Sequence, residues 1–324
     1  MIIVRVPYRV SLFGGGSDFD FFFKKEKSII FSGTINKYIY IIYSENPVDA
    51  PKKHKFSYSK IEEVNSLKKI KHPIINYVFR NNIFKNKKIN LMIKNDMAFS
   101  SGLGGSSSFT VGLVALKNFL SKKKYCPLST YKEAVKIERK ILKEKGGVQD
   151  QAVCAYGGFN KLVFFKNKIN VKKIDKKITN LFSKRLYLVY VSSNINSSKF
   201  YKHNTKNNIF DILRLEVENS KRFEQLINKK NINFNQLKYL FDQNRTNKSL
   251  INYKAYTPDI SNIFNIFIKN KIFNFKLCGS GGRGYIMLLE NKKKIKKIKS
   301  LIGKKYNFTK VNYIDEGPKI ITLD

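Results

Sequence analysis

The alternation of apolar and polar residues predicts strands in the first hundred residues. The segment IIVRVPYRVSLF at 2–13 has the two-residue period of a strand, interrupted at Pro7. A turn, GGGSDF, separates it from a second strand pattern at 31–44, and INLMIKND at 89–96 is a third. We therefore expect the chain to begin as a set of strands.

Two helical patterns follow these strands. The first covers residues 106–120 and begins directly after the stretch SSGLGGSSS. The second covers residues 129–145, where Thr130 and Glu133 have the spacing of a capping box and two glycines form a stop.

The rest of the chain mixes both kinds of element. The predicted strands lie at 160–165, 187–193, 276–290 and 307–314, and the predicted helices at 209–229, 258–270 and 292–299. Strands first and helices after them favour an α+β fold class, in two halves that divide near residue 185.

The composition is that of a folded protein. With 324 residues, 42% of them hydrophobic, the chain can bury a large core. The first ten residues carry two arginines, and no run of about 18 uncharged apolar residues occurs. We therefore expect a soluble cytoplasmic protein with no leader and no membrane partner.

The formal net charge of +40 points at first to nucleic acid. The lysines are spread along the chain, however, together with asparagine and isoleucine, and all three residues have AT-rich codons. The densest run, KKKIKKIK at 292–299, has the pattern of a solvated helix face. We expect no nucleic-acid partner, although a positive field attracts phosphorylated small molecules.

The three cysteines and three histidines predict no metal site and no disulfide. The cysteines are scattered and odd in number, and the histidines form neither HxH nor HExxH. The cysteines read as buried thiols.

The stretch SSGLGGSSS at 100–108 predicts an anion site, since it joins a strand to the N-terminus of a helix. It is not a Walker P-loop, because no lysine follows Gly105, and it is not the dinucleotide fingerprint, because Ser107 stands where a glycine is needed. The alternative is a serine-rich surface loop with an ordinary N-cap.

Four glycine-rich segments occur in order along almost the whole chain. They are RVPYRVSLFGGGSDF, SGLGGSSSFTVGL, GGVQDQAVCAYGGFN and CGSGGRGYIMLL. As an ordered set they resemble the GHMP kinases, and within that superfamily they look most like the D-glycero-D-manno-heptose 7-phosphate kinases.

This resemblance implies a two-domain GHMP kinase fold. A β-α-β domain of ribosomal-protein-like fold would cover residues 1–185, and a ferredoxin-like domain residues 186–324. The resemblance also implies an enzyme, a sugar kinase that uses ATP and Mg²⁺ to phosphorylate the anomeric hydroxyl of a small-molecule sugar phosphate. The product would be a heptose 1,7-bisphosphate for nucleotide-heptose and surface glycan synthesis.

The resemblance assigns two catalytic residues. Asp150 would face the acceptor hydroxyl as a base or an orienting charge, and Arg9 would lie near that hydroxyl and the transferred phosphate. The sequence alone favours Asp150 as the N-cap of a short helix QAVCAY, and it allows Arg9 to be a surface charge at a strand edge.

The same resemblance assigns the binding residues. The nucleotide would bind at Ser101, Gly102, Leu103, Gly104, Gly105, Ser106, Ser107 and Ser108. The sugar would contact Gly15, Gly16, Ser17, Asp18, Gln149, Gly281 and Gly282. Arg283 stands where small residues are usual, and it either reaches a substrate phosphate or is exposed.

Glu138 is a candidate metal ligand. Its helical neighbours three and four positions away are all apolar, so its carboxylate starts from a buried stripe and needs a partner. That partner is either a nearby lysine or arginine, or, by the resemblance, Mg²⁺. The alignment gives a loop serine as the second ligand, Ser106 first and Ser107 next.

Two other functions stay open on the sequence. One is a kinase for another sugar, of the galactose or fucose type. The other is a non-catalytic, basic nucleic-acid-binding protein, which would gather its basic residues on one face with exposed aromatic side chains.

Overall fold

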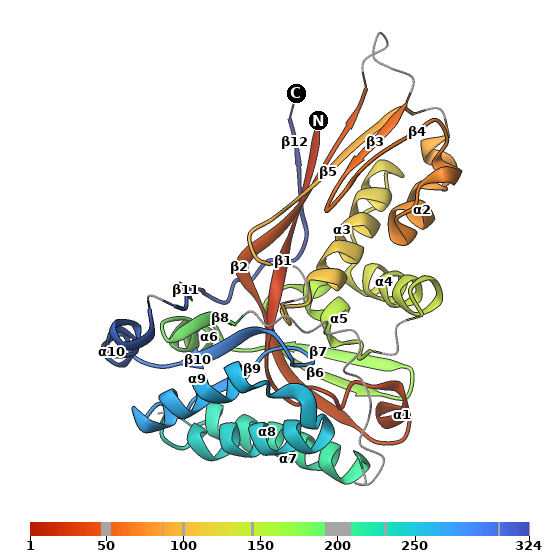
Figure 1. The fold of residues 1–324 in the computed structure, drawn as a ribbon. Helices are drawn as coiled ribbons and strands as arrows, with labels where there is room; N and C mark the ends of the chain where they lie inside the picture. The colour runs from red at the N-terminus through yellow and green to blue at the C-terminus, as the bar shows by residue number, and fades with distance from the viewer. Residues whose placement is uncertain are drawn as a thin grey trace.

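The computed structural model describes residues 1–46, 53–85, 87–98, 101–143, 146–191, 209–229, 232–303 and 305–323. These residues form two β-sheets flanked by helices, with the larger sheet built mainly from the first half of the chain (Figure 1). The predicted α+β class with two sheets is confirmed.

The large sheet has the strand order β12-β1-β2-β5-β3-β4, and β6 and β7 extend it from β2. Its strands are β1 (Ile2–Phe13), β2 (Ser28–Glu45), β3 (His54–Ser57), β4 (Ile61–Val64), β5 (Ile89–Asn95), β6 (Phe159–Phe165), β7 (Lys168–Lys173) and β12 (Lys319–Thr322). β1 runs through Pro7 without ending, and the interruption there appears only as a shift of register against β2.

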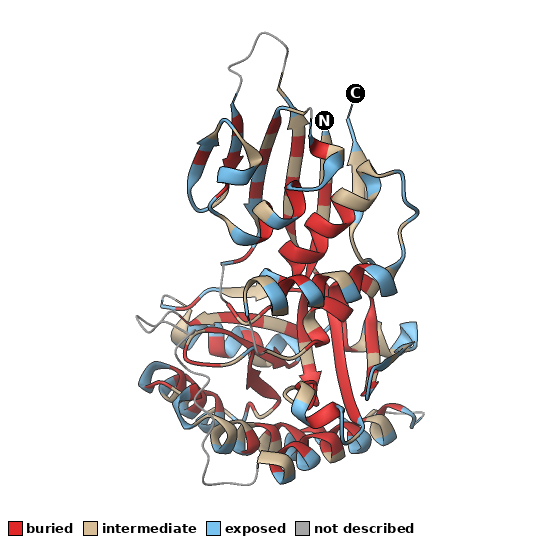
Figure 2. Ribbon diagram, turned by 90° about the vertical axis from the view of Figure 1, so that its right-hand side faces the viewer, coloured by how far each residue is buried: buried red, intermediate tan, exposed pale blue. Residues whose placement is uncertain are grey.

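The helices of the first half are α1 (Asp20–Phe23), α2 (Pro73–Phe79), α3 (Gly105–Leu120), α4 (Pro127–Ile141), α5 (Gln149–Tyr156) and α6 (Lys176–Ser183), with 3₁₀ turns η1 (Leu67–Lys69) and η2 (Asn82–Phe84). α3 packs on β1 and β2. Every residue from Ser107 to Leu116 is buried, so the buried positions surround the helix instead of forming one stripe (Figure 2).

The expected capping box of the second helix is wrong. α4 begins at Pro127 with Cys126 as its N-cap, and Thr130 lies inside the helix. Proline is favoured in the first turn because its missing N–H would have no helical acceptor there. The helix ends at Ile141, before the two glycines, and residues 144–145 of the expected range lie outside the described residues.

The small sheet has the order β11-β8-β10-β9, with all pairs antiparallel. Its strands are β8 (Leu186–Val191), β9 (Phe275–Leu277), β10 (Gly284–Leu289) and β11 (Phe308–Lys310). The helices of this half are α7 (Ile209–Ile227), α8 (Leu237–Ile251), α9 (Pro258–Lys269) and α10 (Lys292–Ile302), with a 3₁₀ turn η4 (Tyr253–Ala255).

A continuous core joins the two sheets. One face of β8, with Leu186 and Leu188, packs into the core of the large sheet, and the other face, with Val189 and Val191, packs on a second cluster around α9. Burial on both faces explains why this strand is almost entirely apolar.

The division of the chain at residue 185 stays a prediction. It falls directly before β8, but the last strand, β12, lies beside β1 in the large sheet (Figure 1). Among the described residues, no helix has the length and apolar character needed to cross a membrane.

Candidate functional site

The two predicted catalytic residues are in direct contact. The guanidinium of Arg9 donates from Nε to Oδ1 of Asp150 at 2.7 Å and from Nη2 to Oδ2 at 2.6 Å. Arg9 is 5% exposed, so the alternative of a surface charge is wrong. Burial lowers the pKa of Arg9, but the charge of Asp150 raises it, and the net shift is upward. Arg9 is therefore a fixed cation that holds the carboxylate in one orientation.

Asp150 lies inside α5 rather than at its cap. The N-cap is Val148, and Asp150 belongs to the first turn of the helix, where an acidic side chain suits the helix dipole. The N-cap interpretation of Asp150 is therefore wrong, and the orientation of its side chain is set by Arg9 of β1 instead.

The glycine-serine loop, residues 101–108, is hydrogen-bonded to Arg9 at two positions. Nη1 of Arg9 donates to the carbonyl oxygen of Gly102 at 2.5 Å, and the backbone nitrogen of Arg9 donates to Leu103 at 3.0 Å. Gly104 then caps α3 with a φ of 74°, a left-handed conformation that glycine adopts without strain. The first N–H groups of α3, from Gly105 onward, have no acceptor within the helix. An anion-binding helix end therefore lies beside Arg9.

The three serines at the start of α3 have different surroundings. Ser106 is exposed, whereas Ser107 is buried and its hydroxyl donates to Oε2 of Glu138 at 3.2 Å. The hydroxyl of Ser108 donates to backbone oxygens, including that of Gly104, and serves the fold. The structure therefore brings Ser107 to Glu138, whereas the preferred Ser106 is exposed.

Glu138 is 3% exposed and belongs to a small polar network. Its Oε2 accepts hydrogen bonds from Ser107 and from the side-chain amide of Gln151 on α5. α3, α4 and α5 each contribute one residue, and Gln151 follows Asp150 in the chain. Gln151 is a site residue that the sequence did not indicate.

The CGSGG turn between β9 and β10 presses on the glycine-serine loop. A Cβ on Gly102 would lie 2.5 Å from the carbonyl oxygen of Cys278, and one on Gly279 would collide with Gly102. Gly284 is packed in the same way against Ser101. The two turns meet backbone to backbone, so these glycines are required by close approach.

The two glycines predicted for the sugar pocket in this turn have another neighbour. A Cβ on Gly281 would lie 2.6 Å from that of Ala255, and the backbone nitrogen of Gly282 donates to Ala255 at 2.9 Å. They join the turn to η4. Arg283 is half-buried, and no hydrogen-bond partner of its Nε occurs in the part of the chain that the structure describes.

Asp18 anchors the first glycine-rich turn to α5. It is 1% exposed, and its carboxylate accepts the backbone N–H of Gln149 at 2.9 Å, the side-chain amide of Gln149 at 3.2 Å and the backbone N–H of Gly16 at 3.1 Å. Burial raises the pKa of Asp18, although these N–H donors lower it. Gly16, Asp18 and Gln149 thus form one network directly before Asp150.

Ser17 lies inside the same turn. It is fully buried, its hydroxyl donates to Gly14 at 2.7 Å, and it lies 2.7 Å from the hydroxyl of Ser28. These contacts satisfy the hydroxyl within the fold, so the structure does not place Ser17 on the surface of the site.

Buried charged residues of opposite sign lie on α7 and β9. Glu216 of α7 is 1% exposed and accepts the side-chain amides of Asn244 and Asn247 of α8, each at 2.8 Å. Lys276 of β9 donates to the carbonyl oxygen of Leu12 in β1 at 3.0 Å. Burial raises the pKa of Glu216 and lowers that of Lys276.

Lys248 of α8 joins this cluster to the loops. Its Nζ donates to the carbonyl oxygen of Gly279, in the turn that packs on Gly102. Burial, and secondarily Lys276, lower the pKa of Lys248 to about 8. Nothing in the sequence separated Lys248 and Lys276 from the rest of the 63 lysine and arginine residues.

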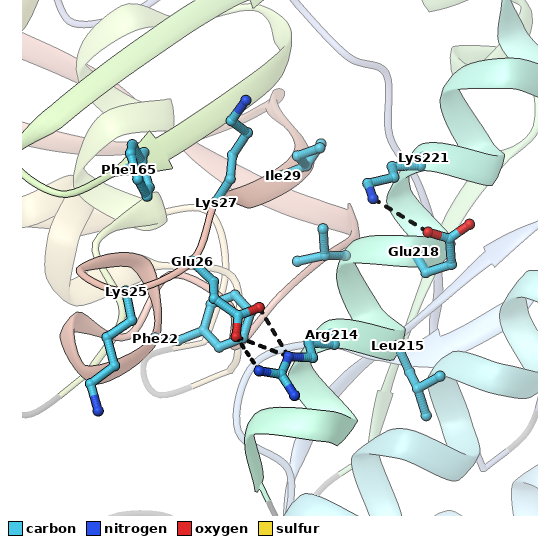
Figure 3. Close-up of a pocket in the computed structure, with 11 residues that line it drawn as sticks. Phe22, Lys25, Glu26, Lys27, Ile29, Phe165, Arg214, Leu215, Glu218 and Lys221 are labelled. Carbon is cyan, nitrogen blue, oxygen red and sulfur yellow. Dashed lines mark hydrogen bonds and ion pairs between the residues drawn. The ribbon is translucent and has the colours of Figure 1, made fainter.

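A pocket of 780 Å³ lies between α7 and the segment that leads from α1 to the start of β2 (Figure 3). Both of its acidic residues are paired with bases in the lining, Glu26 with Arg214 at 2.9 Å and Glu218 with Lys221 at 3.5 Å. Neither Arg9 nor any other predicted site residue lines this pocket. We therefore place the site at Arg9 and the glycine-serine loop, and not in this pocket.

The chain resembles known proteins over its whole length. It is 26% identical over 337 residues to the D-glycero-alpha-D-manno-heptose 7-phosphate kinase of Campylobacter jejuni, with 98% of each chain covered. Residues 67–158, which include α3, α4 and α5, match the family described as GHMP kinases N terminal domain. The chain is therefore similar to GHMP kinases in this segment and over its full length. The resemblance drawn from the four glycine-rich segments is thereby confirmed.

Solved structures of GHMP kinases share the fold. A D-glycero-D-manno-heptose 1-phosphate kinase from Bacteroides thetaiotaomicron has a TM-score of 0.78 at 20% identity, with 100% of both chains covered. The mevalonate kinase of Methanococcus jannaschii has a TM-score of 0.72 at 20% identity, with 96% of this chain and 98% of that chain covered. The chain is an enzyme, a sugar phosphotransferase, and GHMP kinases use ATP.

Proposed function

We propose that this enzyme transfers the γ-phosphoryl group of ATP to the anomeric hydroxyl of D-glycero-D-manno-heptose 7-phosphate, giving the 1,7-bisphosphate for nucleotide-heptose and surface glycan synthesis. The choice of sugar is supported by the full-length similarity to the Campylobacter jejuni kinase of that name. The observation that carries the chemistry is the ion pair of buried Arg9 with half-buried Asp150, beside the N-terminus of α3.

The roles of the residues follow from charge and position. The phosphates of ATP bind the free N–H groups at the start of α3, in the loop 101–108. Asp150 orients the acceptor hydroxyl or takes its proton as the oxygen attacks the γ-phosphorus and the bond to ADP breaks. Arg9 contacts both Asp150 and the loop at Gly102, and it neutralises charge on the transferred phosphoryl group.

The oxygen atoms of Glu138 and Ser107 fit Mg²⁺. Both are hard donors, and their separation of 3.2 Å is close to the roughly 3 Å that two adjacent ligands of octahedral Mg²⁺ span. Mg²⁺ keeps several waters and needs few protein ligands, so two side chains suffice. When bound, the ion would neutralise charge on the nucleotide phosphates.

The sugar is proposed to lie over the first glycine-rich turn. Gly15, Gly16, Asp18 and Gln149 surround that position directly before Asp150. Ser17, Gly281 and Gly282 have their contacts inside the protein, and we give them no direct contact with the sugar.

A substrate comparison tests the proposal. ADP release is measured at equal concentrations of heptose 7-phosphate, heptose 1-phosphate, unphosphorylated heptose, galactose and fucose. We expect the fastest turnover with heptose 7-phosphate and a product whose new phosphorus signal couples to the anomeric proton. Faster turnover of a free sugar or of the 1-phosphate would refute this substrate and leave the kinase chemistry standing.

A further inference from the structure

Ser11 lies on the same face of β1 as Arg9. The two residues are separated by one position in a regular part of the strand, where Arg9 pairs with Thr34 and Ser11 with Ser32 of β2, so both side chains leave the same side of the sheet. The Oγ atom of Ser11 is buried, and it has no hydrogen-bond partner in the described ranges of the chain. A buried hydroxyl in this state is unusual in a folded protein.

A second buried polar atom without a partner belongs to Gln149 of α5. The amide nitrogen of Gln149 is held by Asp18 at 3.2 Å, which fixes the orientation of the amide group. Its Oε1 atom is buried and also lacks a hydrogen-bond partner within the part of the chain that is described. Gln149 as a whole is 9% exposed, so the amide oxygen has little access to water.

Gly15 lies between these two side chains. A Cβ at this position would lie 3.5 Å from Nε2 of Gln149 and 3.7 Å from Oγ of Ser11, both ordinary contacts. Its neighbours Gly14 and Gly16 have φ of 84° and 96°, but Gly15 is not among the described residues with positive φ. The backbone therefore does not require glycine here, and the missing side chain keeps the space between Ser11 and Gln149 open.

We infer that Ser11 and the amide oxygen of Gln149 bind one hydroxyl group of the acceptor sugar, with Ser11 as a residue that determines specificity. A sugar hydroxyl can donate to Oε1 of Gln149 and accept from Oγ of Ser11, so it satisfies both atoms at once. The inference rests on the proposed function in one respect, that the acceptor is a sugar. A site built this way rejects an analogue without that hydroxyl, because its polar atoms are then left unpaired.

The test substitution is Ser11→Ala. We expect kcat/KM for the sugar to fall about tenfold or more, the size of one lost hydrogen bond, while the KM for ATP stays unchanged. The melting temperature should not fall, because the Ser11 hydroxyl makes no hydrogen bond to the described residues that could be lost. A merely structural role predicts the opposite, a lower melting temperature with unchanged sugar kinetics.

Deoxy analogues of the sugar identify the hydroxyl. Wild-type enzyme should discriminate against one deoxy analogue, and Ser11→Ala should lose that discrimination while keeping it toward the others. The matched control is Ser32→Ala, the same change on the residue that pairs with Ser11 in β2, whose hydroxyl donates to Val10. This control should leave sugar kinetics unchanged.

Gly15→Ala provides an independent variant. Its backbone and its contacts tolerate a methyl group, so the protein should fold, and the methyl would occupy the sugar position and raise the KM for the sugar. All assays use the sugar that the enzyme turns over fastest, so rejection of heptose 7-phosphate would refute only the proposed substrate. Unchanged kcat/KM in Ser11→Ala, or the same penalty with every deoxy analogue, would overturn the inference.

Discussion

The donors of Arg9 are divided between two partners. Nε and Nη2 reach Asp150, and Nη1 reaches the carbonyl oxygen of Gly102. A lysine could not make these contacts together, since it offers a single point of charge instead of a planar fork. The positions of the Asp150 carboxylate and of the glycine-serine loop therefore both depend on the side chain of Arg9.

Replacing Asp150 by asparagine tests the catalytic assignment. We expect kcat to fall by ~10²–10⁴, the usual contribution of a positioned base or charge, because the amide keeps the shape but not the negative charge. ATP binding, measured by titration calorimetry, should persist, since the loop 101–108 is unchanged. A kcat near that of the wild type would remove Asp150 from the mechanism.

The metal assignment has a matched pair of serines. Glu138→Gln and Ser107→Ala should each raise the Mg²⁺ concentration needed for half-maximal rate, because each loses a ligand oxygen or its charge. Ser106→Ala, on the exposed neighbour, should leave it unchanged. A larger effect at Ser106 than at Ser107 would contradict the geometry described above.

The sequence predicted the neighbourhood of each site residue better than its orientation. The ordered motifs located Arg9, Asp150 and Glu138, and the structure brings the first two into contact. The motifs could not choose between Ser106 and Ser107, because successive residues of a helix point about 100° apart and the first turn of α3 fixes which one faces α4. Gln151 escaped notice because its contact with Glu138 depends on the packing of two helices.

Among the elements that the sequence missed are α8 and β12, together with α2, β7 and α6. α8 buries Leu237, Leu240 and Phe241 but then Asn244 and Asn247, so the apolar stripe by which a helix is recognised in sequence stops after its first turns. β12 has four residues and is held by its pairing with β1. By contrast, α3, α7 and α9 have long apolar patterns, and the predicted ranges for them were nearly right.

The pH dependence of stability tests the role of α8. Burial lowers the pKa of Lys248 to about 8, below its value in the unfolded chain. Between these two values the unfolded chain binds more protons than the native protein, so the free energy of unfolding should rise with pH above about 8. Lys248→Met should remove this rise, which has a limiting slope of ~1.4 kcal/mol per pH unit.

Urea unfolding of the wild type and of Lys248→Met at a series of pH values gives the comparison. The other ionisable groups of the cluster, Glu216, Lys276 and Cys278, are present in both proteins and contribute to both curves. Parallel curves between pH 8 and pH 10 would show that Lys248 titrates in the native protein as it does in the unfolded chain.

At the scale of the whole molecule, the net charge of +40 acts on stability as well as on substrates. Like charges repel in the compact state, and salt screens them over a distance of about 10 Å at 0.1 M. The melting temperature should therefore rise as NaCl increases from ~0.01 M to ~0.2 M. KCl at the same ionic strength should give the same shift, and a falling melting temperature would show that attractive ion pairs dominate.

The pairing of β12 with β1 also has a consequence for connectivity. The amino group of Met1 donates to the carbonyl oxygen of Leu323 at 2.7 Å, across 322 positions of the sequence (Figure 1). Closing a loop of that length costs roughly 5 kcal/mol of chain entropy, which is close to the maximum for any contact in a chain of this length. A short linker between the two ends would make it a local contact. A circularly permuted chain, with its original ends joined and new ends at a surface turn far from β1, should therefore keep β1 paired with both β12 and β2.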